Sequence, residues 1–123
     1  MRRGTYSIVA RDPPTGELGV AVQSHWFAVG SVVTWARPGV GAAATQSVAE
    51  VAHGPNALDR LQGGMDAAGA IEAVLAEDEL ARFRQLGVVD ARGAARGLYV
   101  QADAGRARGR RARLLGGPGR GRR

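Results

Sequence analysis

The chain opens with a stretch in which apolar and polar side chains alternate. Between Thr5 and Arg11, one face of an extended segment carries Tyr6, Ile8 and Ala10. The other face carries Thr5, Ser7, Val9 and Arg11. A period of two predicts a strand over 5–11. A dense turn signal over 12–16 and a second alternating segment over 18–24 follow, so we expect an antiparallel hairpin.

Two further segments also have the composition of strands. Residues 29–36 are rich in β-branched side chains, and residues 40–45 are almost all small. Between them, Arg37-Pro38-Gly39 is typical of a tight turn. The small side chains of 40–45 indicate that a helix or a second sheet packs closely against this strand.

After Thr45 the period changes from 2 to 3.6, which predicts helices over 46–63 and 66–79. Gly54-Pro55 breaks or restarts the first helix, and Asp66 is a good N-cap for the second. Strands are expected again over 86–90 and 95–100. Four strands, two helices and two strands predict a layered α+β fold without βαβ units.

Charge divides the chain into two parts. Residues 1–103 hold nine Arg and eleven acidic residues, whereas residues 104–123 hold eight Arg and no acid. We therefore expect one domain over 1–103 and a disordered Arg/Gly-rich tail over 104–123. The tail fits a basic arm for nucleic acid or a frame-shifted end of a GC-rich gene. Since it has no aromatic side chain for base stacking, no specific nucleic-acid partner is expected.

The remaining composition excludes several kinds of site. The 123 residues include no Cys and no Lys, so thiolate chemistry and a lysine base are absent. Two His and scattered acids lack metal-ligand spacing, so neither a metal nor a cofactor is expected. No apolar run is long enough for a membrane span and no signal sequence is evident, which favours a cytoplasmic protein.

Several blocks of the sequence carry a resemblance to known proteins: TYSIVARD at 5–12, TGELGVAV at 15–22, AVG at 28–30, GVGA and ATQ within 36–46, GP at 54–55 and RQLGVVD at 84–90. In this order, the blocks resemble a bacterial family called domain of unknown function 1028. The resemblance fades beyond about residue 94. It implies the N-terminal part of an αββα sandwich like that of N-terminal-nucleophile (Ntn) hydrolases, with the later strands and helices missing.

The resemblance also implies a catalytic residue. In that superfamily the first residue of the first strand is the nucleophile and its free α-amine is the base, and the matching position here is Thr5. Met1–Gly4 would have to be removed. Active members often place a Lys near the nucleophile; here only Arg11 or Arg37 could supply charge, and a backbone N–H near Gly39–Gly41 could stabilise an oxyanion.

Two functions stay open on this basis. One is an amide-bond hydrolase acting on an unidentified small molecule or peptide, with Thr5 as its nucleophile. The other is a catalytically inactive scaffold or binding module, in which Thr5 is a β-former that opens an edge strand. Because part of the fold is expected to be missing, exposed strand edges would favour a homo-oligomer.

Four other polar residues are weaker candidates. Ser24 and His25 are neighbours on a strand, so their side chains point to opposite faces and form no dyad. His25 is expected to lie with Trp26 in the loop after the second strand, lining a cleft. His53, beside a helix break, is expected to be exposed, and Asp90 to be a turn residue.

Overall fold

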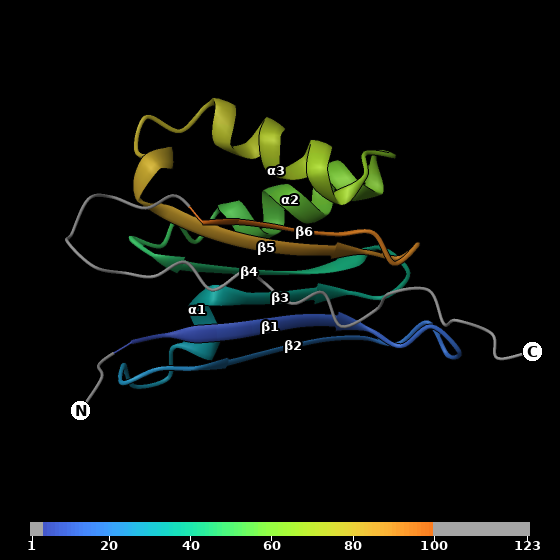
Figure 1. The fold of residues 1–123 in the computed structure, drawn as a ribbon, viewed down its shortest axis with the longest axis horizontal. Coiled ribbons are helices and arrows are strands. Elements are labelled where there is room, and N and C mark those ends of the chain that lie inside the picture. Colours follow the sequence, from blue (N-terminus) through green and yellow to red (C-terminus); the bar gives the residue numbers. More distant parts are fainter. Residues whose placement is uncertain (1–3, 100–123) are drawn as a thin grey trace, which may run out of the picture.

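The computed structural model describes residues 4–99, which form an α+β unit of antiparallel strands and helices (Figure 1). The strands are β1 Tyr6–Arg11, β2 Leu18–Gln23, β3 Thr34–Arg37, β4 Gly41–Ser47, β5 Arg84–Asp90 and β6 Ala95–Tyr99. The helices are α1 Gly30–Val33, α2 His53–Gln62 and α3 Ala67–Ala76, and a 3-10 turn covers Ala81–Phe83. The predicted tail over 104–123 lies outside the described residues.

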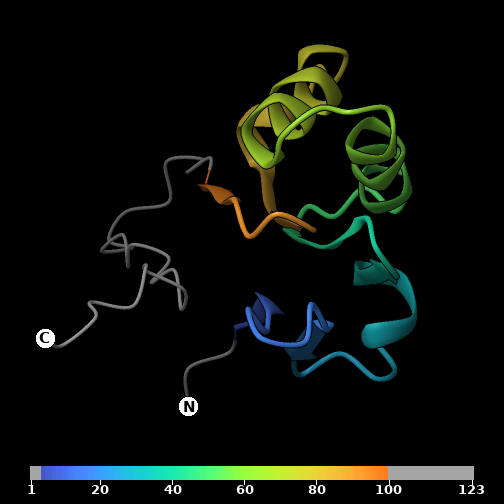
Figure 2. The ribbon, with the colours of Figure 1, turned by 90° about the vertical axis from the view of Figure 1, so that its right-hand side faces the viewer.

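These elements stack in three layers. Strands β1 and β2 form a hairpin, and β3-β4-β5-β6 form a four-stranded sheet with every pairing antiparallel. Helices α2 and α3 cover one face of the sheet, and the hairpin packs on the other face (Figures 1 and 2). The predicted α+β class is confirmed. Among residues 4–99, both long helices lie on the same side, so the outer face of the hairpin has no helical layer.

Small residues in β4 allow the layers to approach one another closely. Ala42, Ala43 and Ala44 are almost completely buried, and the apolar side chains of α2, α3 and β5 pack against the strand. Alternate residues of β4 face opposite layers: Ala43 belongs to the helix-side core, while Gln46 reaches the hairpin. Close packing on both faces of 40–45 is the physical reason for its composition.

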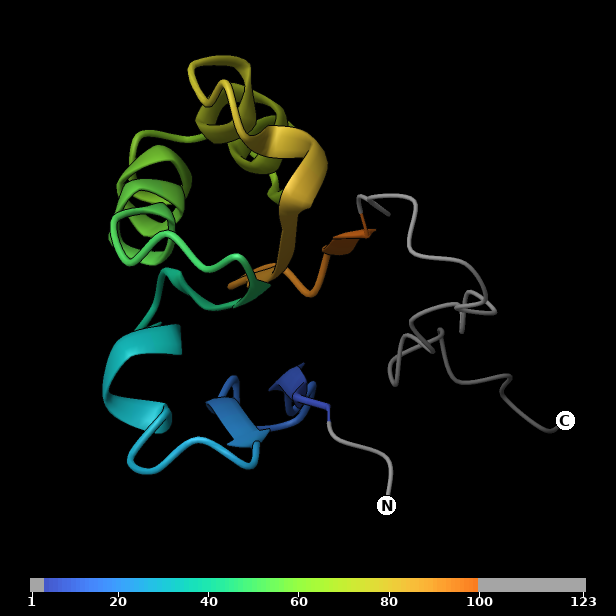
Figure 3. The same ribbon diagram turned by 90° about the vertical axis from the view of Figure 1, so that its left-hand side faces the viewer.

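The prediction of a strand over 29–36 is wrong in its first half. Residues Gly30–Val33 form α1, which lies at the side of the molecule where the chain passes from the hairpin to the sheet (Figure 3). The Ser31 and Thr34 hydroxyls donate to the carbonyls of Ala28 at 2.8 Å and Gly30 at 2.6 Å, which favours a helical turn. These local bonds and the burial of Val33 outweigh the β-propensity of the segment.

The prediction of a helix from residue 46 is also wrong at its start. Strand β4 continues to Ser47, since Gln46 pairs with Gln85 and Ser47 with Arg84. Helix α2 begins only at His53. Pro55 therefore lies within the first helical turn, where a backbone N–H has no intrahelical partner, and it neither breaks nor restarts the helix. Asp66 caps α3 as expected, accepting the Gly69 N–H at 2.8 Å.

Candidate functional site

Thr5 lies at the open end of the hairpin, away from its turn and directly before β1. Its Oγ1 is 2.7 Å from the Oγ of Ser24, the residue that follows β2. The pair is partly buried, while the preceding residue, Gly4, is exposed. The hairpin register brings these hydroxyls together, because Tyr6 pairs with Gln23 and the two neighbours continue the ladder.

Gln46 holds the same end of β1 from the four-stranded sheet. With its amide oriented so that donors face acceptors, Gln46 donates to the Thr5 carbonyl at 3.0 Å. It also accepts from the Ser7 backbone N–H at 2.7 Å and from the Ser7 hydroxyl. Since Gln46 is almost completely buried, these bonds fix the backbone of Thr5 between the two sheets. We call Thr5, Ser7, Ser24 and Gln46 the hydroxyl cluster.

A loop that contains His25, Trp26 and Phe27 follows Ser24 in the chain. The Trp26 N–H donates to Ser24 Oγ at 3.2 Å, and the rings of His25 and Trp26 are 5.4 Å apart. Trp26 and Phe27 are strongly exposed, and Ala28 has a φ of 54°, a left-handed conformation that is rare for alanine. The loop position of His25 and Trp26 is confirmed. Ser24 bonds to Thr5 and to the Trp26 amide, so the structure likewise has no Ser24–His25 dyad.

The charged side chains expected near Thr5 lie elsewhere. Arg37 bonds to Asp59 at 2.9 Å and to Gln62 at 2.6 Å. Arg11 lies at the opposite end of β1, where it pairs with Leu18. Neither arginine therefore supplies charge to the Thr5 hydroxyl.

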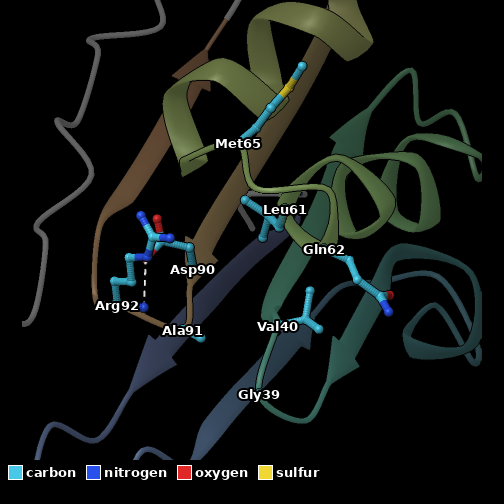
Figure 4. A pocket seen from close by; sticks show the side chains of 8 residues that line it. All are labelled: Gly39, Val40, Leu61, Gln62, Met65, Asp90, Ala91 and Arg92. Carbon is cyan, nitrogen blue, oxygen red and sulfur yellow. Dashed lines mark hydrogen bonds between the residues drawn. The ribbon is translucent and has the colours of Figure 1, made fainter.

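The expected oxyanion donor near Gly39–Gly41 is also remote from Thr5. Gly41 begins β4 and Gln46 is near its end, so five residues at ~3.3 Å each separate them by roughly 16 Å. Gly39 instead lines a separate pocket of about 220 Å³ (Figure 4). There Asp90 accepts the backbone N–H groups of Arg92 and Ala94, each at 2.9 Å. Asp90 is thus the turn residue that was expected.

A buried ion cluster lies on the helix side of the sheet. Asp78 Oδ2 is 2.6 Å from His53 Nε2 and 2.7 Å from Arg84 Nε. Asp78 Oδ1 accepts the Leu80 N–H at 2.9 Å, and Arg84 donates to the Val48 carbonyl. The cluster therefore ties the start of α2 to the segment after α3, to β5 and to the loop after β4.

The electrostatics of this cluster follow from its geometry. The hydrogen bond from Arg84 is the main cause that holds the pKa of Asp78 well below its ordinary value, and burial opposes it. The same bond raises the pKa of Arg84. The expectation that His53 is exposed is wrong: the residue is only 6% exposed, because its ring packs at the helix start and bonds to Asp78.

Sequence reasoning missed the partners of Thr5, although one signal was available. Ser24 shares its face of the hairpin with Val20 and Val22, as Ser7 does with Thr5 and Val9. Polar residues at the same end of several inward faces can indicate a shared site. Among residues 4–99, no group of three His, Cys, Asp or Glu side chains is arranged to hold a metal ion, and no helix is long and apolar enough to cross a membrane.

Comparison with known proteins gives a family for this chain. The model described as "Family of unknown function (DUF1028)" matches residues 5–111, which extends beyond residue 94, where we expected the resemblance to fade. A solved structure of protein SPO2555 from Silicibacter pomeroyi, assigned to the same family model, is 30% identical with a TM-score of 0.75. The match covers 78% of this chain and 43% of that one, so the chain spans less than half of that relative's length. No curated protein matches.

Proposed function

The chain belongs to the DUF1028 family of unknown function, and we propose that it is an amide-bond hydrolase whose nucleophile is the Thr5 hydroxyl. The observation that carries this proposal is the contact of 2.7 Å between Thr5 Oγ1 and Ser24 Oγ at the start of the first strand. A hydroxyl becomes a useful nucleophile when its proton has an acceptor and its position is fixed. The hydroxyl cluster fixes Thr5 from both sheets.

The base in this proposal is the α-amine of Thr5 itself, freed by removal of Met1–Gly4. An α-amine has a pKa of about 8, so it can accept the Oγ1 proton near neutral pH. Oγ1 then forms a bond to the amide carbon, the C–N bond breaks, and the amine product leaves with the proton. Water hydrolyses the resulting ester and restores the Thr5 hydroxyl. The exposed Gly4 leaves the bond before Thr5 accessible to cleavage.

The first test is the mass of the intact protein purified from its own cells. A chain that begins at Thr5 supports the proposal, because only then is the α-amine free. A chain that begins at Met1 or Arg2 would show that Thr5 does not become an N-terminal nucleophile. That result would favour the hypothesis of a catalytically inactive scaffold.

The second test measures the reactivity of the hydroxyl without knowledge of the substrate. The protein is produced as a fusion whose partner is cleaved off, so that Thr5 becomes the N-terminal residue. This protein is treated with a β-lactone, and its acylation is followed by mass spectrometry and peptide mapping. We expect one acyl group on Thr5 and none in Thr5→Ala. Thr15→Ala is the matched control, since Thr15 is an exposed threonine in the same hairpin that bonds to Asp12. Equal labelling of wild type and Thr5→Ala would contradict the proposal.

A further inference from the structure

Ser24 contacts the oxygen that would react, and its own hydrogen bonds define what it can do there. A hydroxyl has one proton to donate and two lone pairs that accept. The Trp26 N–H occupies one lone pair of Ser24 Oγ at 3.2 Å, and the bond of 2.7 Å joins Ser24 to Thr5 Oγ1. In that bond either oxygen can be the donor.

Loss of the Thr5 proton decides the direction of this bond. While Thr5 keeps its proton, Thr5 can donate and Ser24 can accept. Once Thr5 Oγ1 gives up its proton it can only accept, and Ser24 is then the donor. A donor aimed at an oxygen that gains negative charge stabilises the charged form and lowers the pKa of the hydroxyl.

The two arginines that were expected near Thr5 do not provide this help. The chain contains no Lys, Arg37 is bound to Asp59 and Gln62, and Arg11 lies at the other end of β1. We infer that Ser24 is a catalytic residue that donates its hydrogen bond to Thr5 Oγ1 as that oxygen attacks. This inference rests on the proposed function, because it assumes that Thr5 is the nucleophile.

Every proton is accounted for when Thr5 attacks the acyl carbon. The Thr5 O–H bond breaks, its proton passes to the α-amine, and a bond forms between Oγ1 and the acyl carbon. Ser24 keeps its own proton and changes only from acceptor to donor. The Trp26 N–H, which donates to Ser24 Oγ, makes the Ser24 hydroxyl a stronger donor through the chain of hydrogen bonds.

The backbone holds Ser24 in place for this role. Ser24 follows directly on β2, so its position relative to Thr5 is set by the hairpin ladder. The loop after it returns to the fold through Ala28, at a positive φ of 54°, and Ser31 Oγ donates to the Ala28 carbonyl at 2.8 Å. The Trp26 amide is thereby kept on Ser24, which leaves the Ser24 proton for Thr5.

The test measures the rate of Thr5 acylation by a β-lactone against pH, in protein that begins at Thr5. We expect Ser24→Ala to lower the rate constant at neutral pH by about 10²-fold, as loss of a strong hydrogen bond to a charged oxygen does. Its rate should also continue to rise to higher pH than that of wild type. Ser24→Thr retains a hydroxyl and should recover most of the rate. Thr15→Ala is the control, because this exposed hydroxyl bonds to Asp12 in the turn of the same hairpin, at the end of the strands away from Thr5 and Ser24.

The outcomes separate this inference from the proposed function. If Thr5 is acylated at the same rate and with the same pH profile in Ser24→Ala, Ser24 has no catalytic role although Thr5 remains a nucleophile. If Thr5 is not acylated in wild type, the proposed function fails first. A thermal melt of each variant identifies loss of folding. If Ser24→Ala does not fold, wild type is compared with Ser24→Thr instead. Acylation about 10²-fold slower in a Ser24→Thr protein that melts like wild type would overturn the inference.

Discussion

Among single residues, Asp78 carries the most concentrated electrostatic interaction in the described part of the chain. Its carboxylate bonds to His53, Arg84 and the Leu80 amide, and the Asp78 and Arg84 side chains are 10% and 7% exposed. Removing one partner of a buried pair leaves the other charge without compensation. The residue should therefore matter more for stability than any surface ion pair.

Asp78→Asn should lower the free energy of unfolding by about 3 kcal/mol, because the Arg84 guanidinium would stay buried without a countercharge. Urea denaturation at neutral pH measures this change. Asp59→Asn is the matched control: Asp59 pairs with Arg37 but is 66% exposed, and its loss should cost less than ~1 kcal/mol. Equal effects of the two substitutions would contradict the assignment of a buried cluster.

The same carboxylate predicts a pH dependence. The pKa of Asp78 is lower in the folded state than its ordinary value of 3.8, so its stabilisation is present above that value. It is lost as the pH falls further, because the unfolded chain takes up the proton first. The stability difference between wild type and Asp78→Asn should therefore shrink between about pH 6 and about pH 3. A constant difference over this range would show that the Asp78 carboxylate is not titrating as described.

At the scale of elements, helix α2 packs closely against the sheet because Gly54 has no side chain. A Cβ on Gly54 would overlap the ring of Trp35 on β3, whereas one on Gly63 would meet only ordinary contacts. Gly54 therefore allows the first turn of α2 to lie directly on the ring, and Trp35 packs against the core from this position.

Gly54→Ala should consequently destabilise the protein by about 2 kcal/mol, since the added methyl group overpacks this contact. Gly63→Ala, at the other end of the same helix and with φ of −74°, should change stability by less than about 0.5 kcal/mol. Thermal melts of the two variants compare them directly. If Gly54→Ala is neutral, the helix does not rest on Trp35 in solution as it does here.

Local patterns predicted the elements whose stability is mainly local. The hairpin follows from alternation and a turn signal, and the Asp66 cap of α3 follows from its side-chain chemistry. The start of α2 did not, because the extension of β4 to Ser47 depends on pairing with Arg84 and Gln85, far along the chain. The segment 30–33 was predicted as strand from its β-branched residues, but hydroxyl-to-carbonyl bonds made it helical.

The candidate site divides in the same way. Thr5 was identified from the start of the first strand, which is a local feature. Ser24 and Gln46 reach Thr5 across the hairpin and between the sheets, and these contacts depend on register and layer packing. For His53 the local pattern gave the wrong environment: its place beside a helix break predicted exposure, but the ring is buried against Asp78, which lies 25 positions away. Local sequence patterns do not predict which distant residues a polar side chain contacts in the folded protein.

At the scale of the whole molecule, the described layers leave apolar side chains exposed on the outer face of the hairpin. On the outer face of the hairpin, Tyr6 is 67% exposed and Ile8 is 47% exposed. The match covers 43% of the solved relative, so this chain spans less than half of that protein's length. Apolar surface is worth ~25 cal/mol per Å², so several hundred Å² left in water forgo several kcal/mol.

We therefore expect the 123-residue chain to self-associate through the outer face of the hairpin, with an apparent mass that rises with concentration. Sedimentation analysis measures this directly. Replacing Tyr6 and Ile8 by Lys should shift the chain toward monomer, because two charges make burial of that face unfavourable. Leu80→Lys is the control, since Leu80 is similarly exposed at 45% but lies in the segment that follows α3. A wild-type chain that is monomeric at every concentration and melts sharply would show that the three layers close a complete core. The hairpin face would then need no partner, and the interpretation of the fold as part of a larger sandwich would be wrong.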